Sequence, residues 1–71
     1  MECFKIEPTV NYSGGCAIVA AHTPDEAIKE YCKSEYNDWI YDEHDCTCNI
    51  IKGMEYDTDT PKVVINEIYI E

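Results

Sequence analysis

Length, composition and charge limit this chain to a small acidic domain. Its 71 residues leave room for one hydrophobic core and one domain, 1–71, whose stability is marginal unless something supports it. Fifteen acidic residues stand against five lysines and no arginine, which gives a net charge of -10. Such a charge argues against direct binding to DNA, RNA or an anionic membrane. With 45% hydrophobic residues, the chain is rich enough in apolar side chains to fold.

The five cysteines are interpreted as free thiols rather than as a disulfide framework. Their number is odd, and the N-terminal residues have neither the basic region nor the long apolar run of a secretory signal. No apolar stretch approaches the roughly 20 residues that span a bilayer. We therefore expect a cytoplasmic protein that is not embedded in a membrane.

The first two predicted elements are strands. Residues 2–10 alternate apolar and polar side chains, as a half-buried strand does. Pro8 lacks a backbone donor, which favours an edge position for its end of that strand. Residues 11–15 are rich in turn formers, and 16–21 are typical of a second strand. The pattern predicts an antiparallel hairpin.

The clearest local signal is the start of a helix. Thr23 is a suitable cap, Pro24 suits the first helical position, and Glu26 completes a capping box three residues after the cap. The predicted buried stripe consists of Ala27, Ile28, Tyr31 and Cys32. This stripe is compatible with two C-terminal ends of the helix, one near Ser34 and one near Tyr41.

Two further strands are predicted after the helix. Residues 46–56 form the third, and Gly53 marks a bulge or an early end within it. Residues 57–61 are a loop, and 62–71 form a fourth strand rich in valine and isoleucine. The order is ββαββ, which predicts the α+β class, with one helix packed on a mainly antiparallel sheet of about four strands.

The fourth predicted strand is apolar on both faces. Strict alternation places Val63, Ile65 and Tyr69 on one face and the other apolar residues on the second, namely Val64, Ile68 and Ile70. One helix covers only one face of a sheet, so a second copy of the chain would cover the other, and we predict a homodimer. The alternative is a bulge near Asn66 or Glu67 that rephases the strand.

His44, Cys46 and Cys48 form the most suggestive group for chemistry, since imidazole and thiolate are the ligands that zinc prefers. In an extended strand, however, His44 and Cys48 lie about 13 Å apart, too far for one ion without a bend. The favoured interpretation is that Cys46 and Cys48 continue an apolar stripe, with a thiol or zinc-binding protein as the rival hypothesis. The chain carries no recognised catalytic motif, so we expect neither an enzyme nor a cofactor.

Charge is concentrated in the window 35–59, which holds eight acidic residues and one lysine. Tyr36, Trp39 and Tyr41 are interleaved with the acids, and aromatic anchors beside a charged rim are common in protein-binding surfaces. Duplex DNA carries one negative charge per about 1.7 Å of axis, so an array of carboxylates can occupy a phosphate-binding channel. The alternative is a solvated acidic face with its aromatic residues in the core.

These observations predict a non-enzymatic interaction module that mimics nucleic acid and binds a basic protein partner. The predicted partner-binding residues are Glu35, Asp38, Trp39, Asp42, Glu43 and Asp45, with Asp57 and Asp59 as a second cluster. A structural subunit of a larger assembly is a third hypothesis. In length, acidity and lack of arginine, the composition resembles that of small proteins that phages and mobile elements use against host machinery. This resemblance transfers no functional residue.

Overall fold

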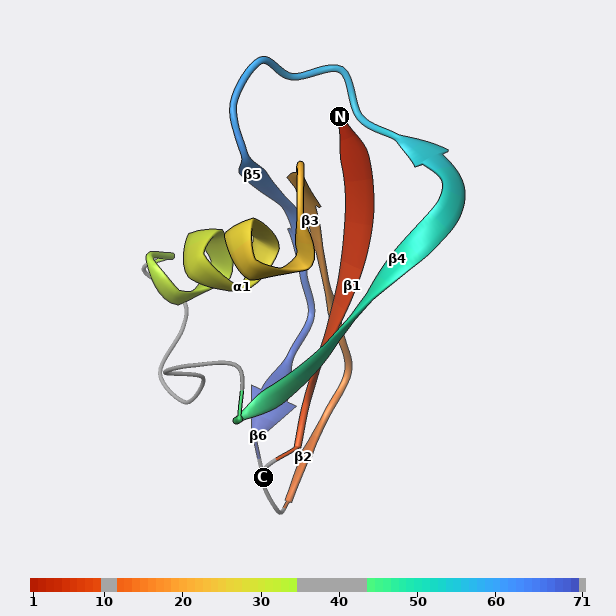
Figure 1. The fold of residues 1–71 in the computed structure, drawn as a ribbon. Coiled ribbons are helices and arrows are strands. Elements are labelled where there is room, and N and C mark those ends of the chain that lie inside the picture. The colour runs from red at the N-terminus through yellow and green to blue at the C-terminus, as the bar shows by residue number, and fades with distance from the viewer. Residues whose placement is uncertain (10–11, 35–43, 71) are drawn as a thin grey trace.

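The computed structural model describes residues 1–9, 12–34 and 44–70, which form one helix packed against a four-stranded antiparallel sheet (Figure 1). The elements are β1 (Glu2–Pro8), β2 (Ser13–Gly14), β3 (Ala17–Ala21), α1 (Pro24–Cys32), β4 (Cys46–Glu55), β5 (Lys62–Asn66) and β6 (Tyr69–Ile70). The sheet order is β4-β1-β3-β5, and β2 pairs with β6 in a short second ladder. The predicted α+β class is confirmed. None of the described helical structure is long and apolar enough to cross a bilayer.

The predicted N-terminal hairpin is formed by β1 and β3, and its last pair is Ile6↔Ala17. Strand β1 lies at the centre of the sheet, between β4 and β3. Pro8 nevertheless lies beyond the last β1–β3 pair and is matched only with Cys46 of β4. The missing N–H of Pro8 therefore costs no ladder bond, which agrees with the predicted edge position for this end of the strand.

Helix α1 begins at the predicted cap. The Thr23 hydroxyl oxygen accepts a hydrogen bond from the backbone N–H of Glu26 at 3.1 Å, and Pro24 is the first helical residue. The helix ends at Cys32, close to the earlier of the two predicted boundaries. The longer alternative, which extends to Tyr41, falls on residues outside those that the structure describes.

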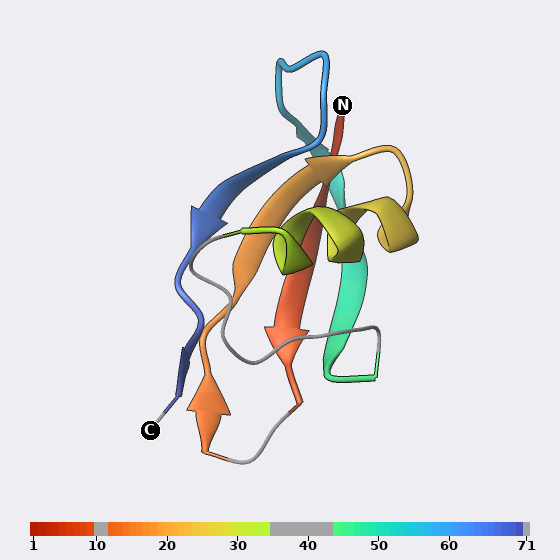
Figure 2. The same cartoon turned by 90° about the vertical axis from the view of Figure 1, so that its left-hand side faces the viewer.

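The core lies between α1 and one face of the sheet (Figure 2). The predicted stripe of α1 is confirmed, because Ala27 and Tyr31 are buried and Ile28 and Cys32 pack against the core. The sheet contributes Phe4, Ile6, Ala17, Val19, Ala21 and Cys46. Burial of apolar area at about 25 cal/mol per Å² makes this cluster the main favourable contribution to folding.

The C-terminal segment corrects the prediction of one strand over 62–71. Strands β5 and β6 are separated by Glu67 and Ile68. A register shift in the pairing with β3 also leaves Val64 as an extra residue in β5. Val63 and Ile68 consequently pack against the same core, although strict alternation assigned them to opposite faces. The strand is rephased, as the alternative expected, but the extra residue is Val64 rather than one near Asn66 or Glu67. The alternation in the sequence therefore does not indicate a second apolar face that another copy would cover.

Gly53 marks a bulge within β4, as one of the two sequence interpretations expected. Its φ is +79°, a conformation that glycine adopts without steric cost. The register with β1 shifts between the pairs Phe4↔Ile50 and Glu2↔Glu55, so β4 contains extra residues there. The bulge therefore decides which residue of β4 lies opposite Glu2.

Candidate functional site

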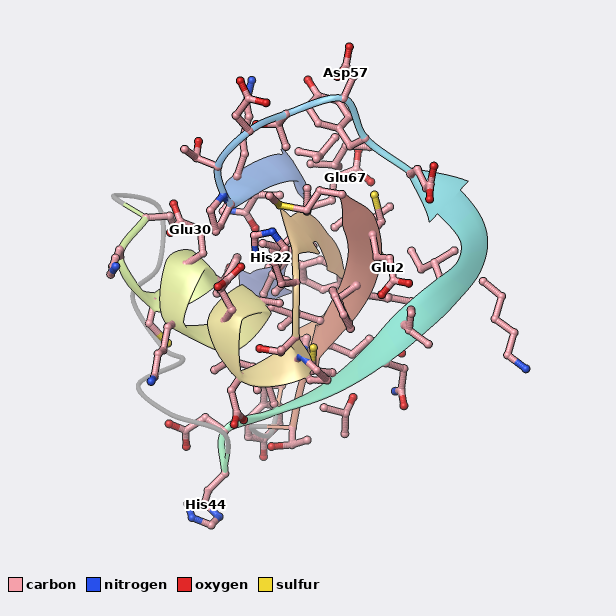
Figure 3. The ribbon with its side chains drawn as sticks, turned by 45° about the horizontal axis from the view of Figure 1, so that its top comes forward. Glu2, His22, Glu30, His44, Asp57 and Glu67 are labelled. Atoms are coloured by element: carbon pink, nitrogen blue, oxygen red, sulfur yellow. The ribbon has the colours of Figure 1, made fainter. Side chains whose placement is uncertain are left out.

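Much of the predicted partner-binding surface lies outside the described residues, namely Glu35, Asp38, Trp39, Asp42 and Glu43. Of the others, Asp45 lies immediately before β4, whereas Asp57 and Asp59 are exposed in the loop that follows it. An extended strand of ten residues spans roughly 30 Å. Asp45 and the two loop aspartates therefore belong to opposite ends of β4, as the positions of His44 and Asp57 in Figure 3 indicate.

Two glutamates that the sequence analysis did not select lie beside the loop aspartates. The backbones of Met1 and Tyr56 bond in both directions, with N···O distances of 2.9 and 3.0 Å. The adjacent pair, Glu2↔Glu55, is therefore a non-hydrogen-bonded pair, in which opposite Cα atoms are about 4.5 Å apart and side chains are closest. Two exposed carboxylates thus face each other across the strands. We call Glu2, Glu55, Asp57 and Asp59 the acidic end.

Positive groups lie near the acidic end, but no ion pair joins them to it within the described ranges. The N-terminal ammonium group of Met1 donates to the carbonyl oxygen of Tyr56 at 3.0 Å. The nearby Lys62 instead places its ammonium group 5.6 Å from the centroid of the Tyr56 ring. Like charges directly opposite each other destabilise a pair of strands. The free chain therefore retains a local repulsion that a cationic partner would relieve.

Side-chain hydrogen bonds organise the loop of the acidic end. The hydroxyl of Thr58 donates to the carbonyl oxygen of Thr60 at 2.8 Å and accepts from the Thr60 N–H at 3.3 Å. Asp57 and Asp59 flank Thr58 and are exposed. The turn thus presents both carboxylates to solvent from a short, internally bonded segment.

The rival thiol group has the burial expected of core residues. His44 is exposed and extends away from the body of the domain (Figure 3), whereas Cys46 is 6% exposed and belongs to the core. Cys48 is half-buried and packs against that core. Within the residues described, no group of three or more His, Cys, Asp or Glu side chains is placed to hold a metal ion. This placement matches the predicted apolar role of Cys46 and Cys48.

The environment of Cys48 also disfavours its thiolate. Its Sγ lies 3.8 Å from the carbonyl oxygen of Pro24. Burial raises the pKa of the Cys48 thiol, and the negative charge of Asp25 raises it further. Because the thiolate is the reactive and metal-binding form, Cys48 is poorly suited to either role. The five cysteines all lie in the described ranges, and none of them forms a disulfide bond.

The carboxylate of Glu26, the second member of the predicted capping box, bonds to the residue before the cap. One carboxylate oxygen of Glu26 accepts from the backbone N–H of His22 at 2.9 Å and lies 2.8 Å from the ring Nδ1 of His22. These hydrogen bonds lower the pKa of Glu26 below its ordinary value. The sequence predicted the Thr23–Glu26 box but gave no signal for the contact with His22.

The fold and charge distribution define a small α+β domain with carboxylates gathered at one end of its sheet. A comparison with protein-family models, curated proteins and solved structures finds no match to this chain. Function is therefore inferred from the residues of the chain itself.

Proposed function

We propose that this protein is a non-enzymatic interaction module that inhibits or regulates a basic, nucleic-acid-binding protein by occupying its phosphate-binding surface. One observation carries the proposal, namely the concentration of carboxylates with few cations among them. The window 35–59 holds eight acids and one lysine, and the acidic end forms no ion pair with a described residue. Fixed carboxylates offer such a partner the charge that a phosphate backbone would offer.

The acidic end provides a physical reason for association. Glu2 and Glu55 repel each other in the free chain, and a lysine or arginine of the partner placed between them would convert this repulsion into attraction. Charge complementarity of this kind mainly raises the association rate and is screened by salt. We therefore expect fast binding that weakens as ionic strength rises.

Capture from a lysate tests the proposal most directly. Tagged protein is incubated with nuclease-treated lysate of its own cell or host, and bound proteins are released by a salt series or by added DNA. We expect recovery of a basic protein that moderate salt or DNA displaces. Recovery of the chain alone would contradict the proposal.

Matched charge variants then test the acidic end against the captured protein. The triple variant Glu55→Gln, Asp57→Asn, Asp59→Asn removes three charges from this end. A control variant removes three charges elsewhere through Glu7→Gln, Glu30→Gln and Glu67→Gln. We expect the first variant to associate about tenfold more slowly with a weaker salt dependence, and the control to change by about twofold or less. Equal effects would show that net charge alone governs binding.

A further inference from the structure

No described strand pairs with the outer edge of β4. Strand β4 pairs with β1 on one side, and in Figures 1 and 2 no other described helix or strand lies beside its outer edge. The opposite edge of the sheet is β5, which is only five residues long, follows Pro61 and contains the extra residue Val64. Proline, bulges and short length all oppose the addition of another strand. Strand β4 also has a bulge, but its residues from Cys46 to Ile50 pair with β1 without a register shift. This part of β4 is therefore the better template for pairing.

The direction of the β4 backbone groups follows from one hydrogen bond. The N–H of Thr9 donates to the carbonyl oxygen of Asp45 at 2.9 Å, which makes Thr9/Asp45 a hydrogen-bonded pair. Hydrogen-bonded pairs alternate along an antiparallel ladder. By this alternation, the N–H and C=O groups of Thr47 and Asn49 form hydrogen bonds with β1, where their partners are Glu7 and Lys5.

Cys48 and Ile50 consequently direct their N–H and C=O groups away from β1. They alternate with Thr47 and Asn49, and they are matched with Ile6 and Phe4 in non-hydrogen-bonded pairs. Neither backbone N–H has a hydrogen-bond partner in the described part of the chain. The Ile50 side chain is also 46% exposed. The outer edge thus presents backbone donors and acceptors beside apolar surface.

The charges along this edge indicate the chemistry of its occupant. Residues 47–51 carry no charge; Asp45 precedes them, and Lys52 follows them before the acidic end begins at Glu55. A strand lying along β4 would therefore meet neutral residues at its centre, Asp45 near one end and, past the single cation Lys52, the several carboxylates of the acidic end near the other.

We propose that the β4 edge binds an extended, basic segment of the partner as an additional strand. The segment carries lysine or arginine near both ends and uncharged residues opposite 47–51. Backbone hydrogen bonds supply affinity in this mode of recognition, and flanking charges supply selectivity. The inference rests on the proposed function, because it specifies how the basic partner is held.

A second copy of this chain is a poorer occupant. Each copy carries a net charge of -10. The repulsion between two such copies opposes self-pairing at this edge.

Amide hydrogen exchange with defined peptides tests the inference. The first peptide has alternating valine and threonine flanked by lysines. A charge control replaces the lysines with glutamates, and a backbone control keeps the lysines but replaces the valines with prolines. We expect only the first peptide to slow exchange at Cys48 and Ile50, by about tenfold or more, while Thr47 and Asn49 stay slow throughout.

The other outcomes overturn the inference in distinguishable ways. Binding of both lysine peptides without slower exchange would leave the acidic surface as a binding site but remove the role of the edge. Equal slowing by the glutamate peptide would refute the charge argument, and binding of none of the peptides would refute the edge itself. Slow exchange at Cys48 and Ile50 without peptide, in dilute protein, would mean that the chain covers its own edge. Slowing that appears only at high protein concentration would identify a second copy.

A substitution at Ile50 gives an independent test. Ile50→Pro removes one outward N–H, whereas the matched variant Ile50→Thr keeps it. We expect Ile50→Pro to weaken binding of the first peptide about tenfold and Ile50→Thr to change it by about twofold or less. Equal affinities would overturn the inference. If Ile50→Pro does not fold, exchange on the unmodified chain decides the question.

Discussion

The two faces of the sheet are stabilised in different ways. On the face under α1, Phe4, Ile6 and Val19 are at most 2% exposed. On the opposite face, β1 presents Lys5 and Glu7, which form an exposed ion pair at 3.6 Å. Residues adjacent in one strand therefore contribute very differently to the free energy of unfolding.

The uncovered face also carries apolar residues. Cys3 of β1 pairs with Ala20 of β3, and both are 0% exposed, although neither belongs to the core cluster under α1. Their neighbours Ile18 and Ile65 also pair, and Ile65 remains 43% exposed. The second face therefore combines apolar residues, some of them exposed, with charged and polar ones.

The largest expected contrast between the faces is at neighbouring positions of β1. Phe4→Ala should lower the free energy of unfolding by about 3–5 kcal/mol, since it removes a buried aromatic ring and leaves a cavity. The matched variant Lys5→Ala should cost about 1 kcal/mol or less, because it removes only an exposed ion pair. Urea denaturation followed by circular dichroism measures both. Similar losses would show that the opposite face is also a core.

A smaller effect on the free energy of unfolding is expected from the hydrogen bond between α1 and the last residue of β5. The Tyr31 hydroxyl donates to Asn66 Oδ1 at 3.0 Å, and the same oxygen accepts from the Ile68 N–H at 3.4 Å. Tyr31→Phe should lower the free energy of unfolding by about 1 kcal/mol. The control Tyr69→Phe changes a side chain that is 55% exposed and should stay within about 0.5 kcal/mol. An equal effect at the two tyrosines would contradict this role for Asn66.

Ile65 tests whether the uncovered face meets another chain. Ile65→Lys should change the free energy of unfolding by about 0.5 kcal/mol or less, because this side chain is partly exposed. Unfolding and molecular mass are measured over a range of protein concentrations. A large loss, together with a concentration-dependent mass for the unmodified chain, would support the homodimer that the sequence suggested.

The smallest expected effect concerns pH and the start of α1. Because the folded state lowers the pKa of Glu26, its contribution is present above the unfolded pKa of about 4.3 and is lost as pH falls through the lower folded value. Glu26→Gln should therefore be less stable than the unmodified chain at neutral pH, and this difference should shrink in acid. Unfolding curves across this pH range measure it. A difference independent of pH would refute the role of the Glu26 charge.

The predictable parts of the fold rest on local chemistry. The Thr23–Glu26 cap, the first-turn Pro24 and the helical stripe depend on residues within a few positions of one another, so their effects appear directly in the sequence. The alternation in β1 and the turn-rich residues after it likewise predicted a hairpin. Burial of Cys46 agrees with its predicted place in an apolar stripe.

The parts that sequence reasoning missed depend on register between strands. Val64 becomes an extra residue only in relation to β3, and nothing in the valine-rich run marks it in advance. Glu2 and Glu55 are distant in the chain and meet through the bulge at Gly53. A bulge changes the partner of every residue beyond it, so its consequence cannot be derived without the neighbouring strand.

The sequence alone determined the α+β class, the start of the helix, the strong negative charge and its concentration after residue 34, because these follow from composition and short-range spacing. Only the tertiary structure decided which carboxylates face each other, where the extra residues of β4 and β5 fall and which strands form the edges of the sheet. These features arise from pairing between distant segments, whose alignment is set by the combined packing of the sheet and helix rather than by any local pattern.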